Sequence, residues 1–183
     1  MNLDAERILK TQVAKHFQIE KYIWLIDNLQ NINIASDKDG FQKKYNGFWN
    51  VRSDSNWRDS YFEYFESVKD KAPSFEKIIM DLNVKLKGRI EPSFSSKMLA
   101  TIDPGRPIWD SRVLVRLGYK DDWKGDNSID NANSIYKRIC GWYAEYFETA
   151  EMKRNIEIFD SYLPEYKDRI SAVKKIDYLL WGM

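Results

Sequence analysis

Apolar side chains recur at intervals of three and four residues along most of this 183-residue chain. That spacing places them on one face of an α-helix, which can then pack against other helices. Alternation of apolar and polar residues, the pattern of a half-buried strand, is not sustained anywhere in the sequence. The sequence therefore predicts an all-α fold, a compact bundle of about eight or nine helices.

The predicted helices begin at capping residues or prolines, and several of them end at glycines or prolines. They cover residues 4–17, 19–29, 54–71, 74–88, 92–102, 107–118, 129–148, a stretch around 156–159, and 166–181. Residues 31–40 and 119–127 are polar and are predicted to form loops. Residues 41–51 are aromatic around Gly47 and fit either a short helix or an aromatic turn. We expect one domain over residues 1–183, with two helical lobes and a cleft as the alternative.

Charge and cysteine content exclude several classes of protein. The net charge is +1, so no overall field attracts the chain to nucleic acid or membranes, and anion binding requires a local patch. The one cysteine, Cys140, cannot form an intramolecular disulfide, which excludes a disulfide-stapled secreted scaffold. The first residues lack the features of a signal peptide, and no apolar run approaches the ~20 residues that cross a bilayer. We therefore expect a cytoplasmic protein with no membrane partner.

Several kinds of site lack the residues they need. A single histidine, His16, excludes a histidine-rich metal cluster and a histidine-based triad. Neither a Walker sequence nor a G-x-G-x-x-G sequence is present. Asp121 and Asp122 fit a solvated loop, and Cys140 fits a small core residue. The sequence predicts neither a metal site nor a cofactor, while its aromatic residues either fill the core or line a groove that stacks on a ligand.

One window of the chain is more basic than the rest. Between residues 85 and 116 the acidic residues are Glu91, Asp103 and Asp110, and the basic residues are Lys85, Lys87, Arg89, Lys97, Arg106, Arg112 and Arg116. Ser93, Ser95 and Ser96 place hydroxyl groups near a predicted helix N-terminus, where the helix dipole favours an anion. This pattern predicts a local phosphate-binding face, and a solvated charged face is the alternative.

The same window carries a family resemblance. Its two specific stretches are Ser93-Phe94-Ser95-Ser96-Lys97-Met98-Leu99 and Pro107-Ile108-Trp109-Asp110-Ser111-Arg112-Val113. Flanking stretches that fit are Phe48-Trp49-Asn50-Val51-Arg52, Trp57-Arg58 and Ile176-Asp177-Tyr178-Leu179-Leu180-Trp181. Together they resemble a group of small bacterial proteins that is similar to the helix–hairpin–helix DNA glycosylases, in particular those that remove 8-oxoguanine.

The resemblance implies a fold, a partner and a set of functional residues. It implies a helix–hairpin–helix glycosylase fold, duplex DNA as the partner and base-excision repair as the function. By position, Lys97 would attack the anomeric carbon of the sugar and Asp110 would assist. The DNA-binding residues would be Lys85, Lys87, Arg89, Ser93, Ser95, Ser96, Arg106 and Arg112. An aromatic and apolar pocket would hold the flipped base.

The sequence departs from the family pattern at three points, one of which is the absence of iron–sulfur cysteines, since Cys140 is the one cysteine of the chain. Phe94, Ser95 and Ser96 stand where the family has glycine-x-glycine, and the spacing from Lys97 to Asp110 is shorter than in the family. Two other functions therefore remain as alternatives: a non-catalytic helical module that binds nucleic acid or protein, and a protein whose aromatic groove binds a small ligand. If Lys97 and Asp110 have no catalytic role, Lys97 is expected to be exposed and Asp110 to cap the helix that begins near Ser111.

Overall fold

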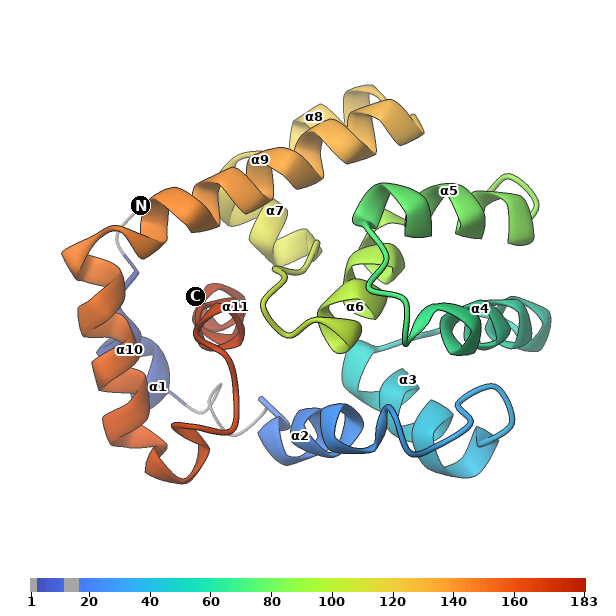
Figure 1. Ribbon diagram of the computed structural model, residues 1–183. Coiled ribbons are helices and arrows are strands. Elements are labelled where there is room, and N and C mark those ends of the chain that lie inside the picture. The colour runs from blue at the N-terminus through green and yellow to red at the C-terminus, as the bar shows by residue number, and fades with distance from the viewer. Residues whose placement is uncertain (1–2, 12–16) are drawn as a thin grey trace. The chain divides into compact units, whose positions relative to one another are not determined.

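The computed structural model describes residues 3–11 and 17–183 of the chain (Figure 1). Within these residues the chain contains eleven α-helices, one π-helix, one 3-10 helix and no strand, which confirms the all-α prediction. Nine of the α-helices correspond to predicted ones. The other two are a helix in the undecided segment 41–51 and a helix in the predicted loop 119–127. None of the helices described is both long and apolar enough to cross a membrane.

The chain divides into two compact units. Unit 1 combines Met1–Phe17 with Pro104–Met183, and unit 2 is the continuous stretch Gln18–Asp103. Each unit is described by itself below.

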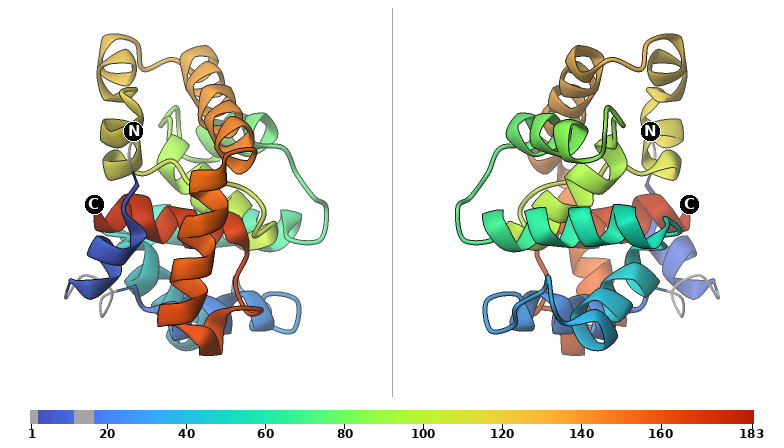
Figure 2. Two further views of the ribbon diagram at one scale, coloured as in Figure 1. Left: turned by 90° about the vertical axis from the view of Figure 1, so that its left-hand side faces the viewer. Right: turned by 90° about the vertical axis from the view of Figure 1, so that its right-hand side faces the viewer.

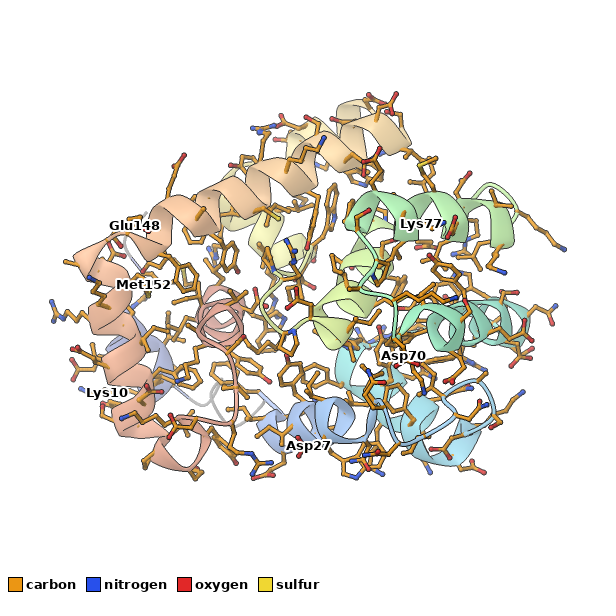
Figure 3. The ribbon with its side chains drawn as sticks, in the orientation of Figure 1. Lys10, Asp27, Asp70, Lys77, Glu148 and Met152 are labelled. Atoms are coloured by element: carbon orange, nitrogen blue, oxygen red, sulfur yellow. The ribbon has the colours of Figure 1, made fainter. Side chains whose placement is uncertain are left out.

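Unit 2 is built around aromatic side chains. Its helices are α2 (Ile19–Asn28), the π-helix η2 (Lys38–Gln42), α3 (Lys43–Trp49), α4 (Ser55–Val68), α5 (Phe75–Lys85) and α6 (Pro92–Ile102). Side chains of Tyr45, Tyr61, Phe62 and Phe65 are fully buried, and the Tyr45 and Tyr61 hydroxyls lie 2.7 Å apart. Rings fill the space among these helices (Figure 3). Much of the high aromatic content therefore forms the core of this unit.

Side-chain caps fix where the helices of unit 2 begin. Asp54 accepts from the Trp57 amide at 2.9 Å, and Ser74 accepts from the Lys77 amide at 3.1 Å, as their sequence positions predict. Asp37 caps the π-helix by accepting from two amides. A Cβ added at Gly40 would clash with this carboxylate, so a larger residue there would displace the cap.

Unit 1 is organised around its last helix. Its helices are α1 (Ala5–Lys10), α7 (Ser111–Leu117), α8 (Lys120–Gly125), α9 (Ile129–Phe147), α10 (Ala150–Tyr162), the 3-10 helix η3 (Pro164–Tyr166) and α11 (Ala172–Gly182). Helix α11 packs against α1, α7 and α10, and α10 crosses it (Figure 2). The Asn155 amide on α10 donates to the Leu3 carbonyl at 2.6 Å, which ties the first residues described to this unit.

Three predicted helix boundaries in unit 1 are wrong. The first helix ends at Lys10, and His16, which was expected inside it, lies outside the described residues. The helix expected from Pro107 begins at Ser111, because residues 107–110 are not helical and Asp110 supplies the cap. The last helix begins at Ala172, where Ser171 accepts from the Lys174 amide at 3.0 Å. In each case a local cap or a non-helical stretch interrupts a continuous apolar pattern.

Candidate functional site

Helices α5 and α6 form a helical hairpin within unit 2. They pack against each other and are joined by the short turn of residues 86–91. At the turn, Lys87 and Gly88 have positive φ angles of 55° and 89°, and Gly88 donates to the Asn83 carbonyl at 2.8 Å. This hydrogen bond reaches back five residues, the 6→1 bond of the Schellman pattern, and it satisfies a carbonyl at the end of α5. A helix, a tight turn and a second helix that carries Lys97 are therefore present in one unit.

The turn of this hairpin is basic on its surface. Lys85, Lys87 and Arg89 are all exposed. Arg89 forms an ion pair of 2.8 Å with Glu91, and the Lys85 amine lies 5.9 Å from the centre of the Tyr64 ring. Three cations against one partly buried carboxylate give this turn a local positive charge, as the sequence predicted for the window.

The backbone of the turn is engaged with the protein itself. The amides of Lys87, Gly88 and Arg89 donate to carbonyls of Val84, Asn83 and Leu86. An anion bound at this turn would therefore be held by the lysine and arginine side chains rather than by these three amides.

The serine residues at the start of α6 do not form the expected exposed hydroxyl cluster. Ser95 and Ser96 are fully buried. The Ser95 hydroxyl donates to the Glu91 carbonyl and the Ser96 hydroxyl to the Ser93 carbonyl, both at 2.9 Å. Their predicted role as phosphate ligands is corrected by this burial, which follows because most residues of α6, including a continuous run from Ser95 to Thr101, are buried. Ser93 is half-buried.

Lys97 is a buried lysine in the second turn of α6. Its exposed fraction is 8%, which contradicts the alternative in which Lys97 is exposed. The amine lies 3.5 Å from the Trp49 carbonyl oxygen, 5.8 Å from the centre of the Trp49 ring and 5.3 Å from the centre of the Phe94 ring. Aromatic faces attract a cation at such distances, and they also form an apolar wall beside the amine.

Helix α4 holds the first turn of α6 in place. Trp57 stacks on Tyr61 with 4.8 Å between ring centres, and its edge meets Phe94 at 4.9 Å. The Tyr61 hydroxyl donates to the Phe94 carbonyl at 2.9 Å, and the Trp57 indole donates to Glu91 at 3.2 Å. Burial raises the pKa of Tyr61 well above its ordinary value, so this hydroxyl remains a neutral donor. The rings beside Lys97 are thus fixed by a second layer of contacts.

Asp110 lies in unit 1 and caps α7. Its Oδ1 accepts from the Arg112 amide at 2.9 Å, which confirms the cap that the sequence allowed. Neither unit by itself contains both Lys97 and Asp110. The catalytic role that the resemblance gives to Asp110 stays a prediction.

Two basic side chains of unit 1 donate hydrogen bonds to carbonyl groups at the C-terminal end of α11. Arg112 donates to the Trp181 carbonyl at 3.0 Å and lies 4.2 Å from the centre of the Trp181 ring, and Arg116 donates to the Met183 carbonyl. Cations there complement the negative end of the helix dipole. Arg106 is exposed, and its charge opposes the effect of burial, which raises the pKa of Cys140. The predicted basic window is therefore divided between the two units.

Comparison of the chain with known proteins identified no related protein. No family model matches the chain, and no curated protein or solved structure is significantly similar to it. The candidate site consequently depends on the residues and contacts described above.

Two features of the structure were not found from the sequence. In unit 1, the Asp177 carboxylate is buried and accepts from the Tyr143 hydroxyl at 2.5 Å. In unit 2, a hollow of about 480 Å³ is lined by Lys38, Asp39, Gln42, Lys43, Asn46, Ser55, Arg58 and Asp59. The signal for the first was a set of charged residues inside the apolar pattern of α11. The hollow had no sequence signal, since its lining comes from segments that are separate along the chain.

Proposed function

We propose that this protein binds duplex DNA and removes damaged bases, with the Lys97 amine as the nucleophile and the α5–α6 turn as the phosphate-binding surface. The observation that carries the proposal is the buried Lys97 amine beside the Trp49 and Phe94 rings, on the second helix of a hairpin with a basic turn. The resemblance at residues 93–99 and 107–113 places a nucleophilic lysine at the same position.

The surroundings of Lys97 suit nucleophilic chemistry. A lysine attacks carbon in its neutral form, and an apolar environment favours the neutral form of an amine. The rings that flank Lys97 also suit a flipped nucleobase, because base-extruding enzymes hold the base between aromatic and apolar side chains. Both properties follow from the packing of α3, α4 and α6 within unit 2.

The proposed reaction has two steps. The nitrogen lone pair of Lys97 attacks C1′ of the sugar, and the bond from C1′ to the base breaks with its electron pair on the base. A proton from the amine passes to the departing base. The C1′–O4′ bond then breaks with its electron pair on O4′, the remaining amine proton passes to O4′, and the resulting imine between Lys97 and C1′ is reduced by borohydride to a stable amine.

The test is borohydride trapping on duplex DNA that contains 8-oxoguanine. The wild-type protein should give a covalent complex, and Lys97→Gln and Lys97→Arg should give none. Lys77→Gln is the matched control, because Lys77 is an exposed lysine on α5 (Figure 3) and should trap like the wild type. Circular dichroism of each variant separates a lost nucleophile from a lost fold. A wild-type protein that forms no trapped complex with 8-oxoguanine or abasic DNA would end the glycosylase proposal.

A non-catalytic DNA-binding module is the second candidate, and the engagement of Asp110 as a helix cap and of Ser95 and Ser96 within α6 favours it. In that case Lys97→Arg should leave DNA affinity unchanged. Lys85→Gln and Lys87→Gln should each lower the slope of log affinity against log salt by about one. This binding without any trapped complex would select the second candidate.

A further inference from the structure

A buried charged cluster lies on α11, a helix of unit 1. Asp177 and Lys174 are 2% and 3% exposed, and the Lys174 amine lies 3.8 Å from Asp177 Oδ2. Oδ1 accepts from the Tyr143 hydroxyl of α9, whereas Oδ2 has no hydrogen-bond partner among the described residues. A buried carboxylate with an unsatisfied oxygen costs stability that an apolar side chain would not cost. The carboxylate therefore calls for a role other than packing.

The cluster faces the segment that leads into α7. The backbone N–H of Ile108 interacts with the Asp177 carboxylate, and the Tyr136 hydroxyl of α9 donates to the Pro107 carbonyl at 3.0 Å. Residues 107–109 are buried and non-helical, so their backbone polar groups have no helical partners of their own. Asp177 and Tyr136 supply partners from α11 and α9. Asp110 follows directly after these residues.

We propose that Asp177 is a positioning residue that holds residues 107–109 in place and thereby fixes where Asp110 stands at the start of α7. This inference rests on the proposed function and on the resemblance, which gives Asp110 an assisting role. Tyr143 orients the carboxylate through Oδ1, and Lys174 supplies a balancing charge on the other side. Asp177 touches neither substrate nor Lys97 in this role.

The charged state of Asp177 should decide how firmly the segment is held. Burial raises the pKa of Asp177 to about 6, and Asp110 pushes in the same direction. Lys174, the Tyr143 hydroxyl and the Ile108 N–H oppose the rise because they favour the charged form. Tyr136, Cys140 and Arg106 are the other titratable groups linked to this cluster. A neutral carboxyl accepts more weakly than a carboxylate, so the Ile108 amide should be held less tightly in acid.

The experiment measures hydrogen exchange of the Ile108 amide by NMR, corrected for the intrinsic rate and compared with the Ile139 amide in α9. In Asp177→Asn, Ile108 exchange at pH 7.5 should rise at least tenfold while Ile139 protection stays within threefold. Asp168→Asn is the control, since Asp168 is an exposed carboxylate of the same unit, and it should leave Ile108 exchange unchanged. Wild-type Ile108 protection should also show an inflection near pH 6 that Asp177→Asn lacks.

Several outcomes separate the positioning role from the proposed function. Equal Ile108 protection in the wild type and Asp177→Asn would overturn the positioning role, whatever the trapping assay shows. If Ile108 protection differs between the wild type and Asp177→Asn as expected, but the wild type forms no trapped complex, the positioning role of Asp177 stands and the glycosylase proposal is rejected. If Asp177→Asn does not fold, Tyr143→Phe replaces it, and the inflection should then move to higher pH. An inflection that does not move would overturn the role.

Discussion

Helix α11 carries two buried charged pairs on adjacent residues, and they differ in how completely they are satisfied. The Lys175 amine lies 2.5 Å from Asp160 Oδ1 on α10 and donates to the Lys167 carbonyl at 2.7 Å. Lys174 and Asp177 are 3.8 Å apart, and one oxygen of Asp177 has no hydrogen-bond partner among the described residues. Each pair joins a buried lysine of α11 to a carboxylate, but Asp160 lies on α10 whereas Asp177 lies on α11 itself.

The difference indicates two kinds of buried charge. Lys175 joins α10, the connection after η3 and α11, so it acts as a tie between parts of unit 1. Asp177 is left with the cost of its burial, which is why its pKa rises to about 6. A short pair with two acceptors fits a structural role, and a buried carboxylate with one unbonded oxygen fits a functional one.

The largest expected effect comes from breaking the complete pair. Asp160→Ala leaves the Lys175 ammonium buried without its carboxylate, and loss of one partner of a buried pair costs about 3 kcal/mol or more. Urea unfolding followed by circular dichroism at pH 7.5 measures this free energy. Asp168→Ala, at an exposed position of the same unit, should change it by less than about 0.5 kcal/mol. A loss below about 1 kcal/mol for Asp160→Ala would contradict the structural role of the pair.

The incomplete pair should appear in the pH dependence of stability. The pKa of Asp177 rises from 3.8 to about 6 in the folded protein, so the folded state binds this proton more tightly than the unfolded state. The resulting stabilisation is complete below pH 3.8 and is lost as the pH rises through 6. The unfolding free energy of the wild type minus that of Asp177→Asn should therefore fall by about 2 kcal/mol between pH 4 and pH 7. A constant difference would show that Asp177 titrates normally.

Tyr143→Phe should sharpen the comparison further. The variant removes the hydroxyl that donates to Asp177 Oδ1, and a hydrogen bond to a charged group contributes about 2 kcal/mol. The unfolding free energy at pH 8 should fall by about that amount. At pH 5 the carboxyl is mostly neutral, and the loss should shrink to about 1 kcal/mol. Identical losses at both pH values would mean that the hydroxyl does not sense the charge of Asp177.

The smallest effect is expected at Asp110, a carboxylate whose structural role is a helix cap. Asp110→Ala should lower the unfolding free energy by about 1 kcal/mol, whereas Asp110→Asn retains a capping oxygen and should change it by only a few tenths, about 0.3 kcal/mol. Turnover of 8-oxoguanine DNA is then measured for Asp110→Asn. Lost turnover with unchanged stability would support the catalytic role, and unchanged turnover would leave Asp110 as a cap alone.

Local signals predicted much of the fold. Residues 92–102 form a helix as expected, because Pro92 and Asp103 bound a continuous apolar stretch. Asp54 and Ser74 cap the helices that they were expected to cap. The loop expected at 119–127 instead contains α8, which has no buried residue and therefore no apolar pattern that could reveal it.

Burial and pairing were harder to predict than helices. Ser95 and Ser96 were expected to offer their hydroxyl groups to an anion near a helix N-terminus, yet α6 encloses both of them. Asp177 and Tyr143 are 34 residues apart, and their contact depends on how α9 and α11 pack. Sequence periodicity identifies one buried face of a helix, but it does not say which polar residues tertiary packing will enclose.

The arrangement of unit 1 has a consequence for its assembly during translation. Residues 3–10 bind α10 and α11, so their final contacts must wait until about 170 further residues have left the ribosome. The stretch Gln18–Asp103 is continuous and meets no such delay. In a nascent chain, residues 18–103 should therefore fold first, while α1 still lacks its packing partners and remains accessible to chaperones.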